Sequence, residues 1–369
     1  MMCNMIEPLD VVFCKLLRIG LGLSQDFPYK LDETEWKTLF VLAKQQTVQG
    51  IVYNSLSRLP EDSRPPRALT MRLSLTVESI RGQNRLMNQE AAHYTQLFAD
   101  RGVQSVILKG PANARLYPDP FSRQAGDIDI WIPGDFDTDA DLLLDMGLIS
   151  KIDPREKRIH HIGFRGDKNI EIEIHHRLAS GMLFRKKAFQ RLLLNEIGDA
   201  MLTPEGFYSP SIRFALLMQL LHLQHHFFYG GLGLRQYMDY YMLLTHSTKE
   251  DRDYVWKCIK KFALSYVCAA VMGLLEMVFG LSRELMLCPP DNKRGMRLYK
   301  LAFSGGNFGK YAPKKAQKEF VLKSWFLRRM HAIQWFSFDP LNTVLREVMY
   351  WKITLSLIPE RIRRRKITL

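Results

Sequence analysis

Every second residue between positions 128 and 132 is isoleucine, and this alternation predicts a β-strand with one apolar and one polar face. Asp127, Asp129 and Trp131 share the polar face, because successive side chains of a strand point to opposite sides of the sheet. The isoleucine face is expected to lie against the core. Two carboxylates would then stand side by side outside it.

The segment before this strand predicts a second, shorter strand and a tight connection. Residues 103–108 (VQSVIL) are typical of a buried strand, and Lys109-Gly110 follows as a turn. Residues 111–117 begin with proline and are expected to form a helical turn.

A further alternating segment lies at residues 169–178, with isoleucines on one side and Glu171, Glu173 and His175 on the other. If the two alternating strands are neighbours, their carboxylates converge, and like charges that close need a proton or a cation between them. Mg²⁺ suits oxygen ligands and phosphate substrates, so the pattern favours a phosphoryl or nucleotidyl transfer site. An ordinary sheet with one wet face is the alternative.

These segments resemble the DNA polymerase beta-like nucleotidyltransferase superfamily and, within it, the uncharacterised bacterial nucleotidyltransferase family sometimes called type 5. The resemblance covers roughly residues 35 to 245. It is carried by Leu108-Lys109-Gly110, Tyr117-Pro118-Asp119-Pro120, Arg123, Gly126-Asp127-Ile128-Asp129, Glu173-Ile174-His175, the run Leu221-His222-Leu223-Gln224-His225-His226, Arg235 and Asp239.

The resemblance implies an enzyme that moves a nucleoside monophosphate from an NTP to an acceptor hydroxyl. Asp127 and Asp129 would hold Mg²⁺, with Mn²⁺ as the alternative ion, and Glu173 would bind the second metal or act as the base. The acceptor is not identified by these residues. Members of the family often accompany surface-polysaccharide genes, so a sugar acceptor is the one that the resemblance suggests.

The chain departs from the superfamily pattern at the turn. Many members have Gly-Ser where this chain has Gly110-Pro111, and the interval to Asp127 is longer than usual. Gly110 would let the backbone approach the triphosphate, and Lys109 or Arg123 would neutralise it.

Three histidines share one face of the helix predicted over residues 211–228, because His222, His225 and His226 fall at i, i+3 and i+4. Contact with substrate, metal binding and hydrogen bonding within the core remain open for them.

Arg235 and Asp239 lie four residues apart on the next helix, where they would form a structural ion pair or line the cleft. His175 is a further candidate for substrate contact. For His160 and His161 we expect one exposed and one packed side chain rather than a catalytic role.

The spacing of apolar residues in the flanking regions is typical of helices, which predicts an α+β protein with a small mixed sheet between helical regions. Residues 1–101 form the N-terminal helical region, 102–205 the catalytic core and 206–369 the C-terminal helical region. Helices are expected from Asp32 to the Pro60 region, over 67–100 and over 136–146. Residues 158–164 are expected to form a further strand.

Residues 262–281 are the most apolar stretch, but Glu276 interrupts them, so a buried core helix is expected and no membrane span. Five cysteines without CxxC spacing indicate neither a disulfide framework nor a cysteine metal site, and fit a cytoplasmic protein. The N-terminus does not resemble a secretory signal.

The positive charge is concentrated at the C-terminal end. Residues 281–369 carry 19 Lys and Arg against 6 Asp and Glu, whereas the rest of the chain has 33 against 32. A solvated basic tail is the ordinary explanation, and an anionic partner such as nucleic acid, a membrane surface or a polyanion is the alternative. Two functions from other classes therefore remain open: a degenerate nucleotidyltransferase fold that binds or regulates, and a surface scaffold that uses the basic end.

Overall fold

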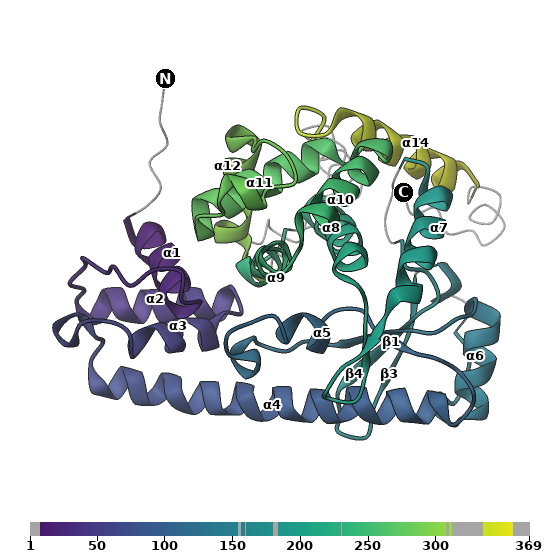
Figure 1. The fold of residues 1–369 in the computed structure, drawn as a ribbon, viewed down its shortest axis with the longest axis horizontal. Helices are drawn as coiled ribbons and strands as arrows, with labels where there is room; N and C mark the ends of the chain where they lie inside the picture. Colours follow the sequence, from purple (N-terminus) through teal and green to yellow (C-terminus); the bar gives the residue numbers. More distant parts are fainter. Residues whose placement is uncertain are drawn as a thin grey trace, which may run out of the picture.

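The computed structural model has a small sheet set between two groups of helices (Figure 1). This arrangement confirms the predicted α+β class. The structure describes residues 8–153, 156–158, 160–179, 184–229, 231–307, 310–311 and 335–356.

The N-terminal helices are α1 (Pro8–Gly20), α2 (Glu33–Gln45) and α3 (Gln49–Leu56). Asp32 caps α2 as predicted: its carboxylate accepts from the Glu35 amide at 2.8 Å, and the Glu35 carboxylate accepts from the Asp32 amide at 2.8 Å. The single helix expected up to the Pro60 region is wrong. It divides between α2 and α3, because Thr47 has a φ of 54° and an α-helix cannot continue through that conformation.

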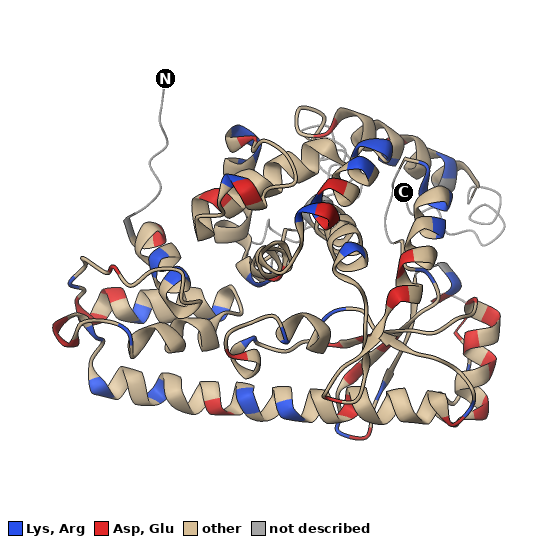
Figure 2. Cartoon of the chain, viewed as in Figure 1, with Lys and Arg blue, Asp and Glu red and all other residues tan. Residues whose placement is uncertain are grey.

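Helix α4 (Arg67–Ala99) has 33 residues and runs beneath both the N-terminal helices and the sheet (Figure 1). Its first half contributes Leu73 and Val77 to the larger hydrophobic core, whereas its second half contributes Tyr94 and Phe98 to the core of the sheet. Acidic and basic residues are mixed along it (Figure 2). It covers nearly the whole of the helix expected over residues 67–100.

The sheet contains β1 (Val106–Ile107), β2 (Ile128–Trp131), β4 (Glu171–His175) and β3 (His161–Arg165), in that spatial order. β2 and β4 run parallel, and both β1 with β2 and β3 with β4 run antiparallel. The predicted strands are confirmed. β1, β2 and β4 are shorter than expected, and β3 begins three residues later and ends one residue later than expected. Residues 111–117 begin with the short helix α5 (Pro111–Ala114).

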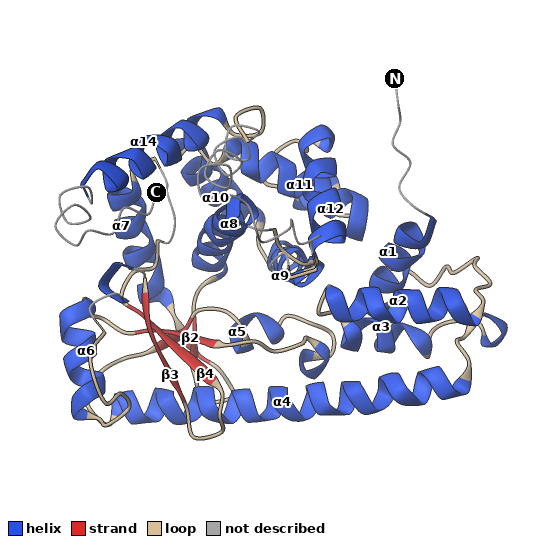
Figure 3. Cartoon of the chain, turned by 180° about the vertical axis from the view of Figure 1, so that it is seen from behind, coloured by secondary structure: helices blue, strands red, loops and turns tan. Residues whose placement is uncertain are grey.

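One face of the sheet is fully covered. The isoleucines of both alternating segments are buried against α4 and against α6 (Phe136–Asp145), as the alternation predicted. Figure 3 shows the strands crossing over α4, with α8 on the opposite side. The polar face of β2 and β4 is therefore left toward the C-terminal helices.

The C-terminal region begins with α7 (Lys186–Glu196) and the hairpin of β5 (Met201–Leu202) and β6 (Tyr208–Ser209). It continues with α8 (Ile212–Tyr229), α9 (Leu234–Thr245), α10 (Lys249–Lys261), α11 (Ser265–Phe279), α12 (Asn292–Gly305) and α14 (Pro340–Ser356). Short 3₁₀ turns η1 to η5 lie at Glu61–Ser63, Pro120–Ser122, Glu156–Arg158, Ile197–Asp199 and Arg283–Leu285.

The apolar stretch 262–281 contains α11 and packs in the core, as expected. None of the helices that the structure describes is long and apolar enough to cross a bilayer.

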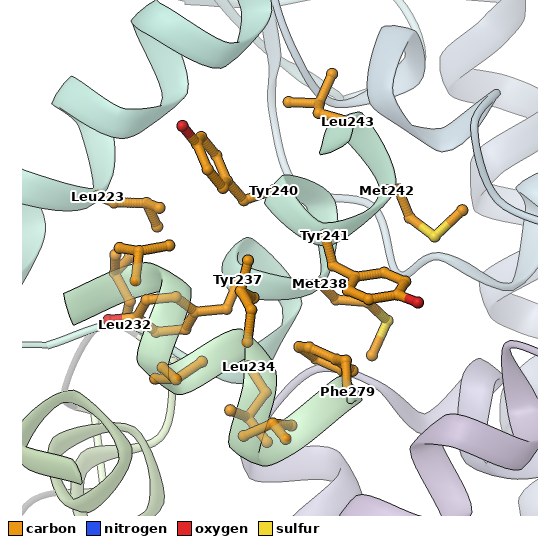
Figure 4. Packing of buried hydrophobic residues seen from close by; sticks show 14 of the residues in the cluster. Leu223, Leu232, Leu234, Tyr237, Met238, Tyr240, Tyr241, Met242, Leu243 and Phe279 are labelled. Atoms are coloured by element: carbon orange, nitrogen blue, oxygen red, sulfur yellow. The ribbon is translucent and has the colours of Figure 1, made fainter. Parts of the chain in front are cut away.

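Helix α9 lies at the centre of the C-terminal helices and is buried all round, from Leu234 to Leu244. Figure 4 shows its aromatic and methionine side chains packed against Leu223 of α8 and Phe279 of α11. A helix with so many partners is held firmly in place. Its few polar side chains are therefore fixed with it.

A buried ion pair joins α9 to the segment that leads into β2. Arg123 donates through Nε and Nη2 to the two carboxylate oxygens of Asp239, each at 2.7 Å, and the Tyr117 hydroxyl donates to the same carboxylate at 2.7 Å. Burial opposes ionisation of Asp239, yet Arg123 and Tyr117 hold its pKa below the ordinary value.

Asp239→Ala leaves the buried guanidinium of Arg123 without its partner, so it should lower the free energy of unfolding by about 3–5 kcal/mol. The double variant Arg123→Met/Asp239→Leu should recover most of that loss. Urea unfolding followed by circular dichroism measures both. Lys249→Ala, which breaks an exposed pair with Asp253, is the control and should change stability by less than about 1 kcal/mol. Equal losses in the single and double variants would contradict this account.

A second buried carboxylate predicts a pH dependence of stability. Asp139 lies in α6 facing the core, and burial, helped by the charge of Asp135, raises its pKa to about 7. The unfolded chain releases this proton near pH 4, whereas the folded chain keeps it until about pH 7. Stability should therefore fall as pH rises between these values.

Asp139→Asn cannot ionise, so it should be more stable than the wild type by about 1–3 kcal/mol at pH 8, with the difference shrinking toward pH 4. Urea unfolding at several pH values gives the profile. Asp141→Asn, on the exposed side of the same helix, should leave the profile unchanged. A profile for Asp139→Asn that parallels the wild type would show that Asp139 does not cause the slope.

Candidate active site

A cavity of about 260 Å³ lies between the polar face of the sheet and the helices α8 and α9. Most of the site residues predicted from the sequence line it. The lining residues are Lys109, Gly110, Arg123, Gly126, Asp127, His160, His161, Glu173, Gln219, His222, His225, His226, Arg235, Gln236 and Asp239.

The strand register brings the predicted carboxylates together. Because β2 and β4 pair in parallel, Asp129 lies directly beside Glu173. Asp127 precedes Asp129 by two residues, just before β2 begins, and lines the same cavity as Glu173. The negative charge of Asp129 and burial raise the pKa of Asp127. The predicted convergence of two strands is therefore present in the structure.

Asp129 is fully buried, and two nitrogen atoms contact one of its oxygens. Lys109 Nζ lies 2.8 Å from Oδ1, and His175 Nε2 lies 2.8 Å from the same atom. Burial alone would raise the pKa of Asp129, but Lys109 and His175 together hold it well below the ordinary value. The same contacts raise the pKa of His175 and of Lys109 against the opposing effect of burial. This cluster therefore neutralises its own charge.

The geometry of these side chains fits a cation. The second oxygen of Asp129, Oδ2, is buried and has no hydrogen-bond partner, so a lone pair is available. Asp129, Glu173 and His175 each offer a ligand atom, and these atoms lie within 4.8 Å of one another. Two carboxylates and one imidazole suit a divalent cation. The imidazole is an addition to the all-oxygen set that the sequence suggested.

Gly110 connects Lys109 to α5 in a conformation that favours glycine. Its φ is +62°, and a Cβ placed there would lie 3.0 Å from the carbonyl oxygen of Asp127. Any side chain would be strained and would crowd the entrance to β2. The glycine therefore keeps the backbone of the turn close to the carboxylates.

The three histidines of α8 line the wall opposite the carboxylates. The His222 and His226 rings lie 4.3 Å apart, and those of His225 and His226 lie 5.1 Å apart. Burial lowers the pKa of His222 and His225 and lowers that of His226 to about 3. These imidazoles are neutral at pH 7. The metal-binding groups found among the described residues do not include them.

His160 and His161 both line the cavity, although one was expected to be exposed. Their rings lie 4.8 Å apart, and His161 Nδ1 is 3.3 Å from the Glu173 carboxylate. The expectation failed because His160 precedes β3 and is not held to strand alternation. Both offer ligand atoms within 4.8 Å of His175.

Gln219 and Gln236 also line the cavity and were not predicted. A signal was present for Gln219, which lies three residues before His222 and so shares its helix face.

Arg235 contacts the backbone of the loop before β2 and not Asp239. Its Nη1 donates to the carbonyl oxygens of Gln124 and Ala125 at 2.7 and 3.2 Å, whereas Asp239 binds Arg123. Of the two alternatives expected for Arg235 and Asp239, the ion pair does not form, because the guanidinium of Arg123 already occupies both carboxylate oxygens, whereas both residues do line the cavity. Burial and the charge of Arg123 lower the pKa of Arg235 to about 10. Arg235 fixes the loop that leads into Asp127.

Comparison with solved structures finds a nucleotidyltransferase-like protein, described as antigenic, from Paracoccidioides brasiliensis. It shares 15% sequence identity, covers 56% of this chain and 94% of its own length, and has a TM-score of 0.37. No curated protein matches the chain. A family model described as uncharacterised nucleotidyltransferase matches residues 32–280. The match includes the carboxylates, the Lys109-Gly110 turn and the histidines of α8, and the chain belongs to this family of uncharacterised nucleotidyltransferases.

Proposed function

We propose that the protein transfers a nucleoside monophosphate from an NTP to an acceptor hydroxyl in a reaction that depends on Mg²⁺ or Mn²⁺. The observation that carries this proposal is the convergence of three carboxylates beside the Lys109-Gly110 turn. Asp127 and Glu173 line one cavity, and the buried Asp129 pairs with Glu173 across the parallel strands β2 and β4. The family match supports nucleotidyl transfer as the reaction class.

Asp129 and Glu173 would hold the cation, with Asp127 beside them at the entrance to β2. When bound, a divalent cation polarises the phosphate and lowers the pKa of an attacking hydroxyl. The buried and unpartnered Oδ2 of Asp129 supports this assignment, because such an atom costs free energy until it gains a partner. Glu173 is partly exposed and serves either as ligand or as proton acceptor.

Lys109 would balance the charge of the donor triphosphate. Its ammonium group forms an ion pair with Asp129 and lines the cavity. It could therefore also donate hydrogen bonds to the phosphate oxygens of a bound nucleotide. The backbone at Gly110 leaves room for the phosphates to approach. Arg123, which pairs with Asp239, would act mainly by fixing α9 against the sheet.

The neutral histidines of α8 would contact the acceptor. A neutral imidazole offers one donor and one acceptor nitrogen, which suits a hydroxyl group better than a phosphate. His222 and His226 lie together on the wall that faces the carboxylates. A sugar hydroxyl, as in polysaccharide synthesis, is the acceptor class that we would test first.

A catalytically degenerate binding module is the second candidate. The observation in its favour is that Lys109 and His175 already contact Asp129 and offset its charge without a metal ion. Such a module would bind a nucleotide without turnover, or bind none.

Two single variants test the proposed activity. Asp127→Asn and Glu173→Gln should each reduce Mg²⁺-dependent pyrophosphate release by about 100-fold or more, since charge stabilisation of the transition state is lost. Release is measured with all four NTPs and a panel of sugar acceptors. Glu171→Gln is the matched control, because Glu171 lies on the same strand but outside the cavity. Nucleotide binding without release by the wild type would favour the binding module.

Metal binding has a readout that needs no turnover. Mg²⁺ or Mn²⁺ added to the wild type should raise the melting temperature, because a ligand that binds the folded state stabilises it. The rise should be absent in Asp129→Asn/Glu173→Gln and present in Glu171→Gln. An equal rise in all three proteins would place the ion elsewhere.

A further inference from the structure

Helix α14 carries an exposed apolar stripe that the proposed activity does not use. Its members recur at intervals of three and four residues, so they lie on one face of the helix. The stripe consists of Leu341, Val344, Val348, Trp351 and Leu355, with exposed fractions of 42%, 46%, 57%, 44% and 58%.

The opposite side of α14 is docked on the protein. Asn342 and Thr343 are buried, and the Asn342 amide donates to the carbonyl oxygen of Ala263 at 3.0 Å. Trp335 and Phe338, just before the helix, are buried in the core. The helix is thus held by one side while its apolar side faces outward.

This grouping differs from the other exposed apolar residues. Outside α14 they occur singly or in pairs, such as Met71 with Leu75 on α4 and Met201 with Leu202 in β5, whereas five members form the stripe. Single exposed apolar residues are normal on a soluble surface, whereas a contiguous apolar stripe marks an interaction site. In Figure 2, α14 is mostly tan, because few of its 17 residues are charged.

The charge of this end of the sequence indicates the kind of partner. Residues 281–369 carry 19 Lys and Arg against 6 Asp and Glu. Lys352 is exposed and lies four residues after Val348, on the same side of the helix. The sequence Arg361-Ile362-Arg363-Arg364-Arg365-Lys366 follows α14, outside the described residues. An apolar helix face beside an exposed lysine, followed in the sequence by a basic run, is complementary to an anionic surface that has an apolar interior.

We propose that α14 binds the protein to the surface of a bilayer that contains anionic lipids. The stripe would enter the boundary between headgroups and acyl chains, with Trp351 at the interface, while Lys352 contacts the headgroups. The helix would lie in the plane of the membrane. This binding is independent of the carboxylates of the cavity.

A second copy of the chain is the less favoured occupant. Pairing two α14 stripes would bring together two strongly basic regions, which repel. A helix of 17 residues is roughly 25 Å long, and one narrow stripe on it buries less area than the roughly 800 Å² per partner of a stable interface.

The test is co-sedimentation of the full chain with vesicles of phosphatidylcholine alone or with about a third phosphatidylglycerol. The wild type should bind the anionic vesicles and bind less in high salt. Val348→Ser/Leu355→Ser keeps the charge and should weaken binding about tenfold or more, since apolar insertion is lost. Val41→Ser/Leu75→Ser removes two exposed apolar side chains elsewhere and should bind like the wild type.

Both variants should fold, because all four side chains are exposed, and circular dichroism melting checks this. Failure of the wild type to bind anionic vesicles would overturn the proposal, and so would equal binding by the α14 variant. Light scattering that finds a dimer in the wild type and a monomer in the α14 variant would also overturn it, in favour of a second copy. Pyrophosphate release is measured separately, so failure of the activity leaves this result interpretable.

Discussion

The parallel pairing of β2 and β4 is the constraint on which the site depends. It sets Asp129 beside Glu173, and it buries the carboxylate of Asp129 away from solvent. A buried charge is tolerated only with partners, and the chain supplies Lys109 from the preceding turn and His175 from the end of β4. The turn, the two strands and the cleft are therefore one electrostatic unit.

Two helices keep this unit in place from opposite sides. Helix α4 supports the isoleucine face of the sheet, whereas α9 holds the loop before β2 through Arg235 and Arg123. Because α9 is buried all round, its polar side chains cannot shift without disturbing the packing of its neighbours. Side chains of the cavity wall that lie far apart in sequence are thereby fixed relative to the carboxylates.

Patterns within single elements made much of this arrangement predictable. The alternation of isoleucine with acidic residues gave the strands and their buried face, and the cap at Asp32 gave the start of α2. Pairing choices between distant elements were not predictable, because sequence spacing does not carry them. Arg235 and Asp239 sit four residues apart, yet Asp239 binds Arg123, which precedes it by 116 positions. The positions of His160 and Gln236 in the cavity depend on tertiary packing in the same way.

The membership of α4 in both hydrophobic cores has a consequence for how the chain folds during synthesis. The helix is synthesised before any strand of the sheet. The apolar face of its second half therefore stays exposed to solvent until β2 and β4 have been synthesised and pack against it. A fragment that begins after α4 would likewise leave the isoleucine face of the sheet bare. The sheet and the N-terminal helices thus share one cooperative unit, in which neither side reaches its native stability without the other.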